Sequence, residues 1–183
     1  MFSHAMHTRI IERQMLMMFA RLAAVTLVLF VAAVPARAEA PKLLAKTGDW
    51  ESFAYSDKAG KVCYAASLPK RSLHAAKNRG AANVTVTHRP AEKSIGVVSV
   101  AGGYAYKKDA IAELDVDGAK FDLFTTGETA WARDDKAVVQ AMLKGKSLVM
   151  HGTPAKGEAT ADTYSLAGFA AAMTEIGKAC GVK

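Results

Sequence analysis

The sequence predicts a mainly β domain of the sandwich or barrel type, with two helices, that follows a cleavable export signal. The first observation is an uncharged apolar run over residues 22–34, closed by Pro35 and by Ala36-Arg37-Ala38. The second is a series of short segments after residue 48 in which apolar and polar residues alternate between turn residues. The third is the helical spacing of apolar residues in two later segments.

The N-terminal 38 residues have the features of a secretory signal peptide. Arg21 precedes the apolar run, and the small-x-small ending at Ala38 is typical of a cleavage site. A run of about 13 residues is short for a membrane span, which needs roughly 20. We therefore expect residues 1–38 to be removed, residues 39–183 to form one domain, and no permanent membrane anchor to remain. The stretch before Arg21 is long for a leader, and a translation start at Met15, Met17 or Met18 is an alternative to Met1.

The charge of the predicted mature part is modest. The whole chain has 24 basic and 17 acidic residues, a net charge of +7, but four of the basic and one of the acidic residues lie in 1–38. The remainder carries +4, which is ordinary for a soluble domain and gives little reason to expect an anionic partner.

Strand signals dominate after a short lead-in over residues 39–48. Val84 and Val86 alternate with Thr85 and Thr87, as expected of a strand with one buried face. Asp117-Gly118 between two alternating segments predicts a tight hairpin, because both turn positions need positive φ. The predicted strands span residues 49–55, 61–68, 82–88, 94–100, 111–116, 119–125, 147–151 and 159–164.

Two helices are predicted among these strands. Asp134 is suited to cap a helix that runs to about Lys144 and ends before Gly145. A second helix is predicted to start near Ser165 as its N-cap and to carry Cys180 on its apolar face.

The mature part contains two cysteines, Cys63 and Cys180. An even cysteine count in an exported chain favours a disulfide, which would tie the terminal helix to the early hairpin. Two buried free thiols are the alternative.

Motifs for catalysis, cofactors or metals are not found in the sequence. His74, His88 and His151 are far apart and lack metal-ligand spacing. Gly145-Lys146-Ser147 lacks the earlier glycine of a phosphate-binding loop and follows a helix instead of preceding one. Asp115 and Asp117 are interpreted as turn residues. We therefore expect no catalytic, cofactor-binding or metal-binding residues.

A basic cluster is the one candidate for surface binding. Lys70, Arg71, Lys77 and Arg79, with His74 among them, occur without an intervening acid. We consider these four basic residues candidate contacts to an anionic glycan or lipid surface, with a solvated loop as the alternative. The cluster lacks the interleaved aromatic residues that stack on bases, so no nucleic-acid partner is expected.

Several motifs resemble the invasion-associated locus B family of alphaproteobacteria. They are Gly48-Asp49-Trp50, Val62-Cys63-Tyr64, Thr87-His88-Arg89-Pro90, Phe124 with Trp131, Asp162-Thr163-Tyr164-Ser165-Leu166 with Gly168-Phe169, and Ala179-Cys180. The resemblance implies an exported protein with an immunoglobulin-like β-sandwich, no agreed catalytic residues, and a disulfide between the two cysteines. It also implies core positions for Trp50 and helix docking by residues 165–169.

The function expected from these features is that of a non-enzymatic binding or stabilising module in the periplasm or at the cell surface. Its partner would be an envelope or host-surface protein, or an anionic glycan or lipid. One alternative is a periplasmic enzyme whose site joins His88 or His151 to a carboxylate. Another is an adhesin that binds glycans or lipids through the basic loop over residues 70–79.

Overall fold

The computed structural model describes residues 40–74 and 79–182, and within them the predicted mainly β class with two helices is confirmed. Eleven strands form one antiparallel sheet in the order β1-β2-β3-β5-β6-β9-β8-β7-β10-β11-β4. The strands are β1 (Lys42–Thr47), β2 (Trp50–Asp57), β3 (Gly60–Ser67), β4 (Arg71–Leu73), β5 (Asn83–Arg89), β6 (Ser94–Ala101), β7 (Ile111–Val116), β8 (Ala119–Thr126), β9 (Thr129–Ala132), β10 (Ser147–Gly152) and β11 (Thr160–Ser165). The helices are the 3₁₀ turn η1 (Pro90–Glu92), α2 (Asp135–Lys144) and α3 (Phe169–Cys180).

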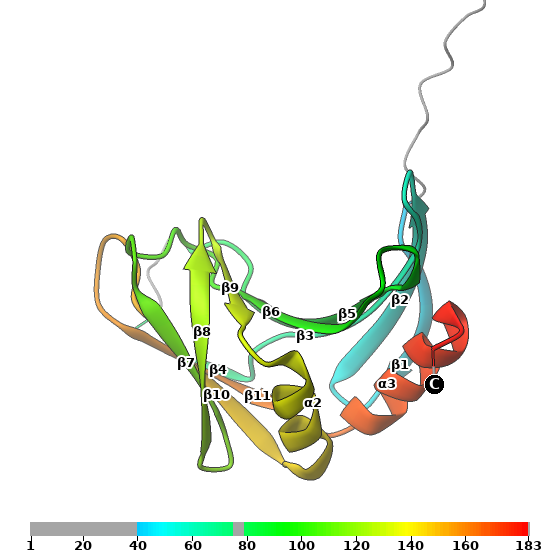
Figure 1. The fold of residues 1–183 in the computed structure, drawn as a ribbon. Coiled ribbons are helices and arrows are strands. Elements are labelled where there is room, and N and C mark those ends of the chain that lie inside the picture. Colours follow the sequence, from blue (N-terminus) through cyan, green and yellow to red (C-terminus); the bar gives the residue numbers. More distant parts are fainter. Residues whose placement is uncertain (1–39, 75–78, 183) are drawn as a thin grey trace, which may run out of the picture. The chain divides into compact units, whose positions relative to one another are not determined.

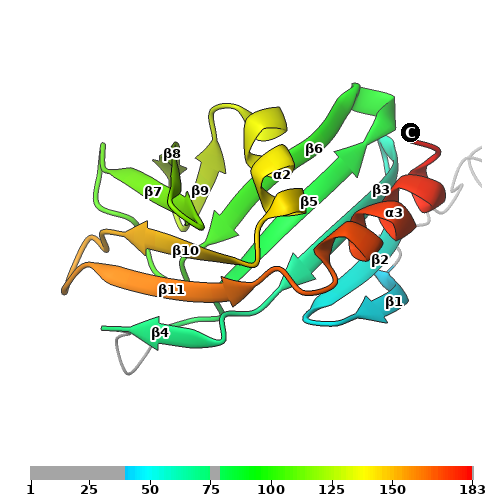
Figure 2. The same ribbon diagram turned by 90° about the horizontal axis from the view of Figure 1, so that it is seen from below.

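The layers expected of a sandwich arise here from one continuous sheet. β6 pairs with β5 along its whole length, but with β9 only through its last residues, Ser99–Ala101. The hydrogen-bonded ladder therefore passes through β6 from one half of the domain to the other without a break. Figures 1 and 2 show β5 and β6 bending across the middle of the domain, with α2 and α3 on the inner side of the bend.

Strand alternation places the core on this inner side. Val84 and Val86 are fully buried, whereas Thr85 and Thr87 lie on the outer face. Trp50 at the start of β2 is also buried and packs on Phe169 of α3, with ring centroids 4.7 Å apart. Burial of such large side chains contributes about 1.5–3 kcal/mol each, so the helices are held mainly by this core.

The local turn and cap predictions are confirmed. Asp117 and Gly118 have φ angles of 47° and 96° between β7 and β8, as a tight hairpin turn requires. The Asp134 side chain accepts a hydrogen bond from the Ala137 backbone N–H (2.9 Å), and α2 ends at Lys144.

The predicted start of the second helix was wrong. Ser165 is the last residue of β11, and α3 begins at Phe169 after Gly168, which has a φ of 92°. The Thr47 hydroxyl donates to the Gly168 carbonyl (3.2 Å), and the Asp49 N–H donates to the Ala167 carbonyl (3.0 Å). Because of these contacts with the β1–β2 turn, the helix begins after Gly168 and not at Ser165. A side chain on Gly168 would collide with the Thr47 backbone.

A disulfide joins Cys63 of β3 to Cys180 at the end of α3, with the two Cα atoms 6.0 Å apart. It therefore ties the C-terminal end of α3 to the sheet, in agreement with the sequence prediction. Within the described part of the chain, no helix combines the length and apolarity needed to span a membrane. The predicted leader, residues 1–38, lies outside the described residues, so its cleavage stays a prediction.

Candidate functional site

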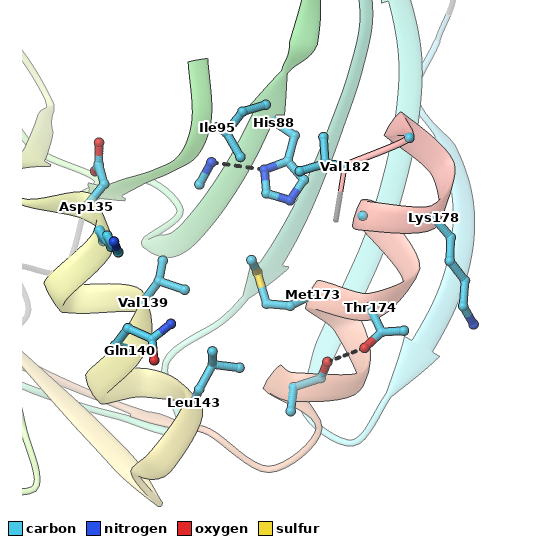
Figure 3. Close-up of a pocket in the computed structure, with 15 residues that line it drawn as sticks. His88, Ile95, Asp135, Val139, Gln140, Leu143, Met173, Thr174, Lys178 and Val182 are labelled. Atoms are coloured by element: carbon cyan, nitrogen blue, oxygen red, sulfur yellow. Dashed lines mark hydrogen bonds between the residues drawn. The ribbon is translucent and has the colours of Figure 1, made fainter. Parts of the chain in front are cut away.

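A groove of about 960 Å³ separates α2 from α3 on the inner side of the sheet, and we call it the α2–α3 groove (Figure 3). Its floor comes from β5 and β6, and its walls come from the two helices. It is lined by His88, Ile95, Gly96, Asp135, Lys136, Val139, Gln140, Leu143, Ala170, Met173, Thr174, Gly177, Lys178, Gly181 and Val182.

The helical periodicity of α2 explains the first wall. Val138 and Met142 are fully buried in the core. Their chain neighbours Val139 and Leu143, four residues apart, lie on one side of the helix and line the groove. Leu143 is 39% exposed, so this wall offers apolar surface that the domain itself does not cover.

The second wall follows the same rule on α3. Phe169, Ala172 and Ile176 enter the core, whereas Met173 and the small residue Gly177 line the groove. Figure 3 shows Met173 on the side of α3 that is turned toward Val139 and Leu143 of α2. The residues facing this part of the groove are mostly apolar or small, as is usual for a binding pocket.

Two titratable groups of the groove, His88 and Asp135, are hydrogen-bonded to the backbone. His88 is buried, its Nδ1 accepts a hydrogen bond from the Gly96 N–H (2.9 Å), and burial lowers the pKa of its imidazole. The Asp135 carboxylate accepts from the Val98 N–H (2.8 Å), and burial raises the pKa of this carboxyl. Both groups therefore hold β6 in place and are not paired with each other as an acid and a base.

The rim of the groove is polar. Lys136 and Gln140 are exposed on α2, and Lys178 on α3 forms an ion pair with Glu175 (3.1 Å). The Thr174 hydroxyl donates to the Ala170 carbonyl (3.0 Å), so it is already paired within its own helix. Apolar walls with a polar rim are the usual anatomy of a binding surface.

Among the described members of the predicted basic cluster, Lys70 and Arg71 are exposed and Arg79 is buried. Arg71 is exposed on the short edge strand β4, and Lys70 forms an ion pair with Asp49. His74 pairs with Glu158 (2.9 Å). Lys77 lies outside the described residues.

Arg79 differs most from the prediction that the basic cluster contacts an anionic surface. It forms a two-pronged ion pair with Asp162, and the two side chains are only 6% and 2% exposed. Its Nε donates to the Gly102 carbonyl, and its guanidinium lies 5.0 Å from the ring centroid of Tyr104. The expectation that Arg79 contacts an anionic surface is therefore corrected: this side chain is a structural element of the interior.

The other histidines do not meet in a common site. His88 is on the groove floor, His74 is at the end of β4, and His151 is exposed on β10. Within residues 40–74 and 79–182, His, Cys, Asp and Glu side chains form no group of three or more suited to hold a metal ion. Asp117, considered in the sequence as a turn residue, accepts hydrogen bonds from the backbone of Lys146 and Ser147.

Sequence reasoning missed the α2–α3 groove. The available signal was the width of the apolar stripe on α2. Val139 and Leu143 directly follow the core residues Val138 and Met142 in the chain and widen the stripe beyond them. On α3, Met173 packs against the core and also lines the groove.

The fold is that of a disulfide-linked, mainly β domain in which two helices cover the inner face of a bent antiparallel sheet. A family model described as invasion associated locus B (IalB) protein matches residues 50–177, and the chain belongs to this family. No curated protein matches the chain.

A solved structure shares the fold. The crystal structure of invasion associated protein B from Bartonella henselae matches with a TM-score of 0.54 and 18% sequence identity. The match covers 78% of this chain and 99% of that chain.

Proposed function

We propose that the protein is an exported, non-enzymatic component of the cell envelope that binds a partner protein through the α2–α3 groove. The observation that carries the proposal is the apolar surface left uncovered between the two helices, which includes Ile95 (44% exposed) and Leu143 (39% exposed). Exposed apolar surface framed by polar residues is typical of an interaction site.

The occupant that suits this site is an amphipathic segment of the partner, with its apolar side chains in the groove. Two helices frame the site on the sheet, and helix-in-groove recognition uses such an apolar surface. Lys136 at the rim favours an acidic residue beside the apolar stripe of that segment, whereas Lys178 is already paired with Glu175. The partner would be an envelope protein or, if the protein reaches the outer surface, a host-surface protein.

Three further features support export and a role without catalysis. The leader has the pattern of a signal peptide. The Cys63–Cys180 disulfide is typical of a protein in an oxidising compartment. In the groove, His88 and Asp135 each bind a backbone N–H, and Thr174 is bound within its helix. These groups stabilise the walls and leave the groove free for contact.

Site-specific photo-crosslinking in the producing cells tests the proposal. A photo-reactive residue at Leu143 should give a discrete adduct with one envelope or surface protein. The same residue at Ser56, which is exposed on β2, should give none. Adding Met173→Glu should weaken the Leu143 adduct, because a carboxylate in the groove opposes burial of the partner's apolar stripe.

The results that contradict the proposal are equally specific. Equal labelling from Leu143 and Ser56, or a Leu143 adduct that Met173→Glu leaves unchanged, would show that the groove is not the contact site. Export has its own test, because mass spectrometry of the envelope fraction should find the chain starting at Glu39, and a chain that keeps residues 1–38 would refute processing.

A further inference from the structure

A second hollow, of about 480 Å³, lies on the face of the sheet opposite the helices. On β2, Glu51 and Phe53 alternate with the buried residues Ser52 and Ala54, so their side chains lie on the outer face (Figures 1 and 2 show β2, β3 and β5 side by side). The residues that matter here are Phe53, Tyr64, Ala66, Thr85, Glu51 and Lys70.

The register of the strands explains why this face is hollowed. Glu51 on β2 pairs with Ala66 on β3, and Ala66 pairs with Thr85 on β5, so two small side chains form the floor. The next cross-strand pair is Phe53 and Tyr64, whose rings stack with centroids 5.0 Å apart and an interplanar angle of 17°. The aromatic pair forms a wall beside the small floor.

The charges around the hollow are balanced. Lys46 pairs with Glu51 (2.8 Å), and Lys70 pairs with Asp49 on the other side. The hydrogen bond from Lys70 holds the pKa of the Asp49 carboxyl below its usual value, so this group is ionised at neutral pH. A phosphate or sulfate would meet two carboxylates here, and a cation would meet two ammonium groups.

We propose that this hollow binds a neutral oligosaccharide. A pyranose ring presents C–H groups that pack on an aromatic ring, and hydroxyl groups that both donate and accept hydrogen bonds. The hollow offers both kinds of surface: the Phe53–Tyr64 wall on one side, and ammonium, carboxylate, hydroxyl and amide groups on the other, with Asn83 supplying the amide. An apolar chain would displace water from these polar groups and offer them no hydrogen bond beyond the pairs that they already form.

The test uses the exported, processed protein and nuclear magnetic resonance titration with three neutral oligosaccharides: chitotetraose, cellotetraose and maltotetraose. We expect at least one of them to give saturable shifts confined to the strands around the hollow. Ala66→Arg fills the floor and should abolish these shifts. Ala119→Arg is the matched control, because it places the same side chain on an exposed strand position outside the hollow and should leave binding unchanged.

Aromatic contact is tested separately. Tyr64→Ala should weaken binding at least about tenfold, which corresponds to 1.4 kcal/mol, whereas Tyr64→Phe keeps the ring and should retain most of the affinity. Absence of saturable shifts with all three oligosaccharides would overturn the proposal. Binding of heparin alone, with loss at high salt, would also overturn it, and so would oligosaccharide binding that survives Ala66→Arg in a folded protein.

Discussion

Breaking the buried Arg79–Asp162 ion pair should cost far more stability than breaking a surface pair. The side chains are 6% and 2% exposed and share two hydrogen bonds. Arg79→Met leaves the Asp162 carboxylate buried without its partner, a change that typically costs 3–5 kcal/mol, so we expect a loss of about 4 kcal/mol. With a urea m-value of about 2 kcal/mol/M for a domain of this size, the unfolding midpoint should fall by about 2 M.

The matched control is Lys46→Met, which removes the Lys46–Glu51 pair, whose side chains are 68% and 41% exposed. Exposed pairs contribute about 0–1 kcal/mol, so this midpoint should hardly move. The double variant Arg79→Met with Asp162→Asn should lose less than the sum of the two single losses, because the stranded charge is removed. A loss below about 1 kcal/mol for Arg79→Met is the range of an exposed pair. It would refute the conclusion that Arg79 and Asp162 form a buried ion pair.

Three further predictions concern stability. Replacing both Cys63 and Cys180 by alanine should lower the free energy of unfolding by about 5 kcal/mol, because the disulfide closes a loop with a sequence separation of 117. Urea unfolding of this variant and of the oxidised protein measures the loss, and an unchanged midpoint would contradict the prediction. Burial lowers the pKa of His88 below its usual 6.5, so the unfolded chain binds the proton more tightly than the folded protein does. The free energy of unfolding should therefore fall as the pH drops below about 6.5. His88→Asn should flatten this dependence in unfolding measurements between pH 8 and 5. Asp134→Ala should cost about 1 kcal/mol through loss of the cap to the Ala137 N–H, and Asp134→Asn much less, as thermal unfolding would show.

Features of the fold set by neighbouring residues could be predicted from the sequence. The alternation of Val84 and Val86 with Thr85 and Thr87 locates β5, and Asp117-Gly118 locates the β7–β8 turn. Features set by pairing between residues distant in the sequence could not be predicted. The strand β4 is three exposed residues long and exists through its pairing with β11, so the local sequence carries little signal for it. The strands β1 and β9 were missed as well, and β1 occupies most of what the sequence suggested was only a lead-in.

The candidate site was harder to predict for the same physical reason. Arg79 looks like one of several basic loop residues until the fold brings Asp162 beside it from 83 positions away. The α2–α3 groove likewise joins residues from two helices and two strand ends. A sequence pattern shows that a helix has apolar residues beyond its core stripe, but it does not show that a second helix stands apart from them.

The two helices of the groove are anchored to the sheet by different contacts. At its N-terminal end α3 is held by the contact of Gly168 with Thr47 and by the packing of Phe169, and at its C-terminal end by the disulfide to β3. The anchor of α2 is different, because Val138 packs in the core and Asp135 binds the backbone of β6. Each helix is therefore positioned mainly by its own contacts with the sheet, and Val139 and Met173 between the helices are only partly buried. Because the disulfide fixes one end of the α3 wall, an oxidising compartment favours the geometry of the proposed binding site as well as the stability of the fold.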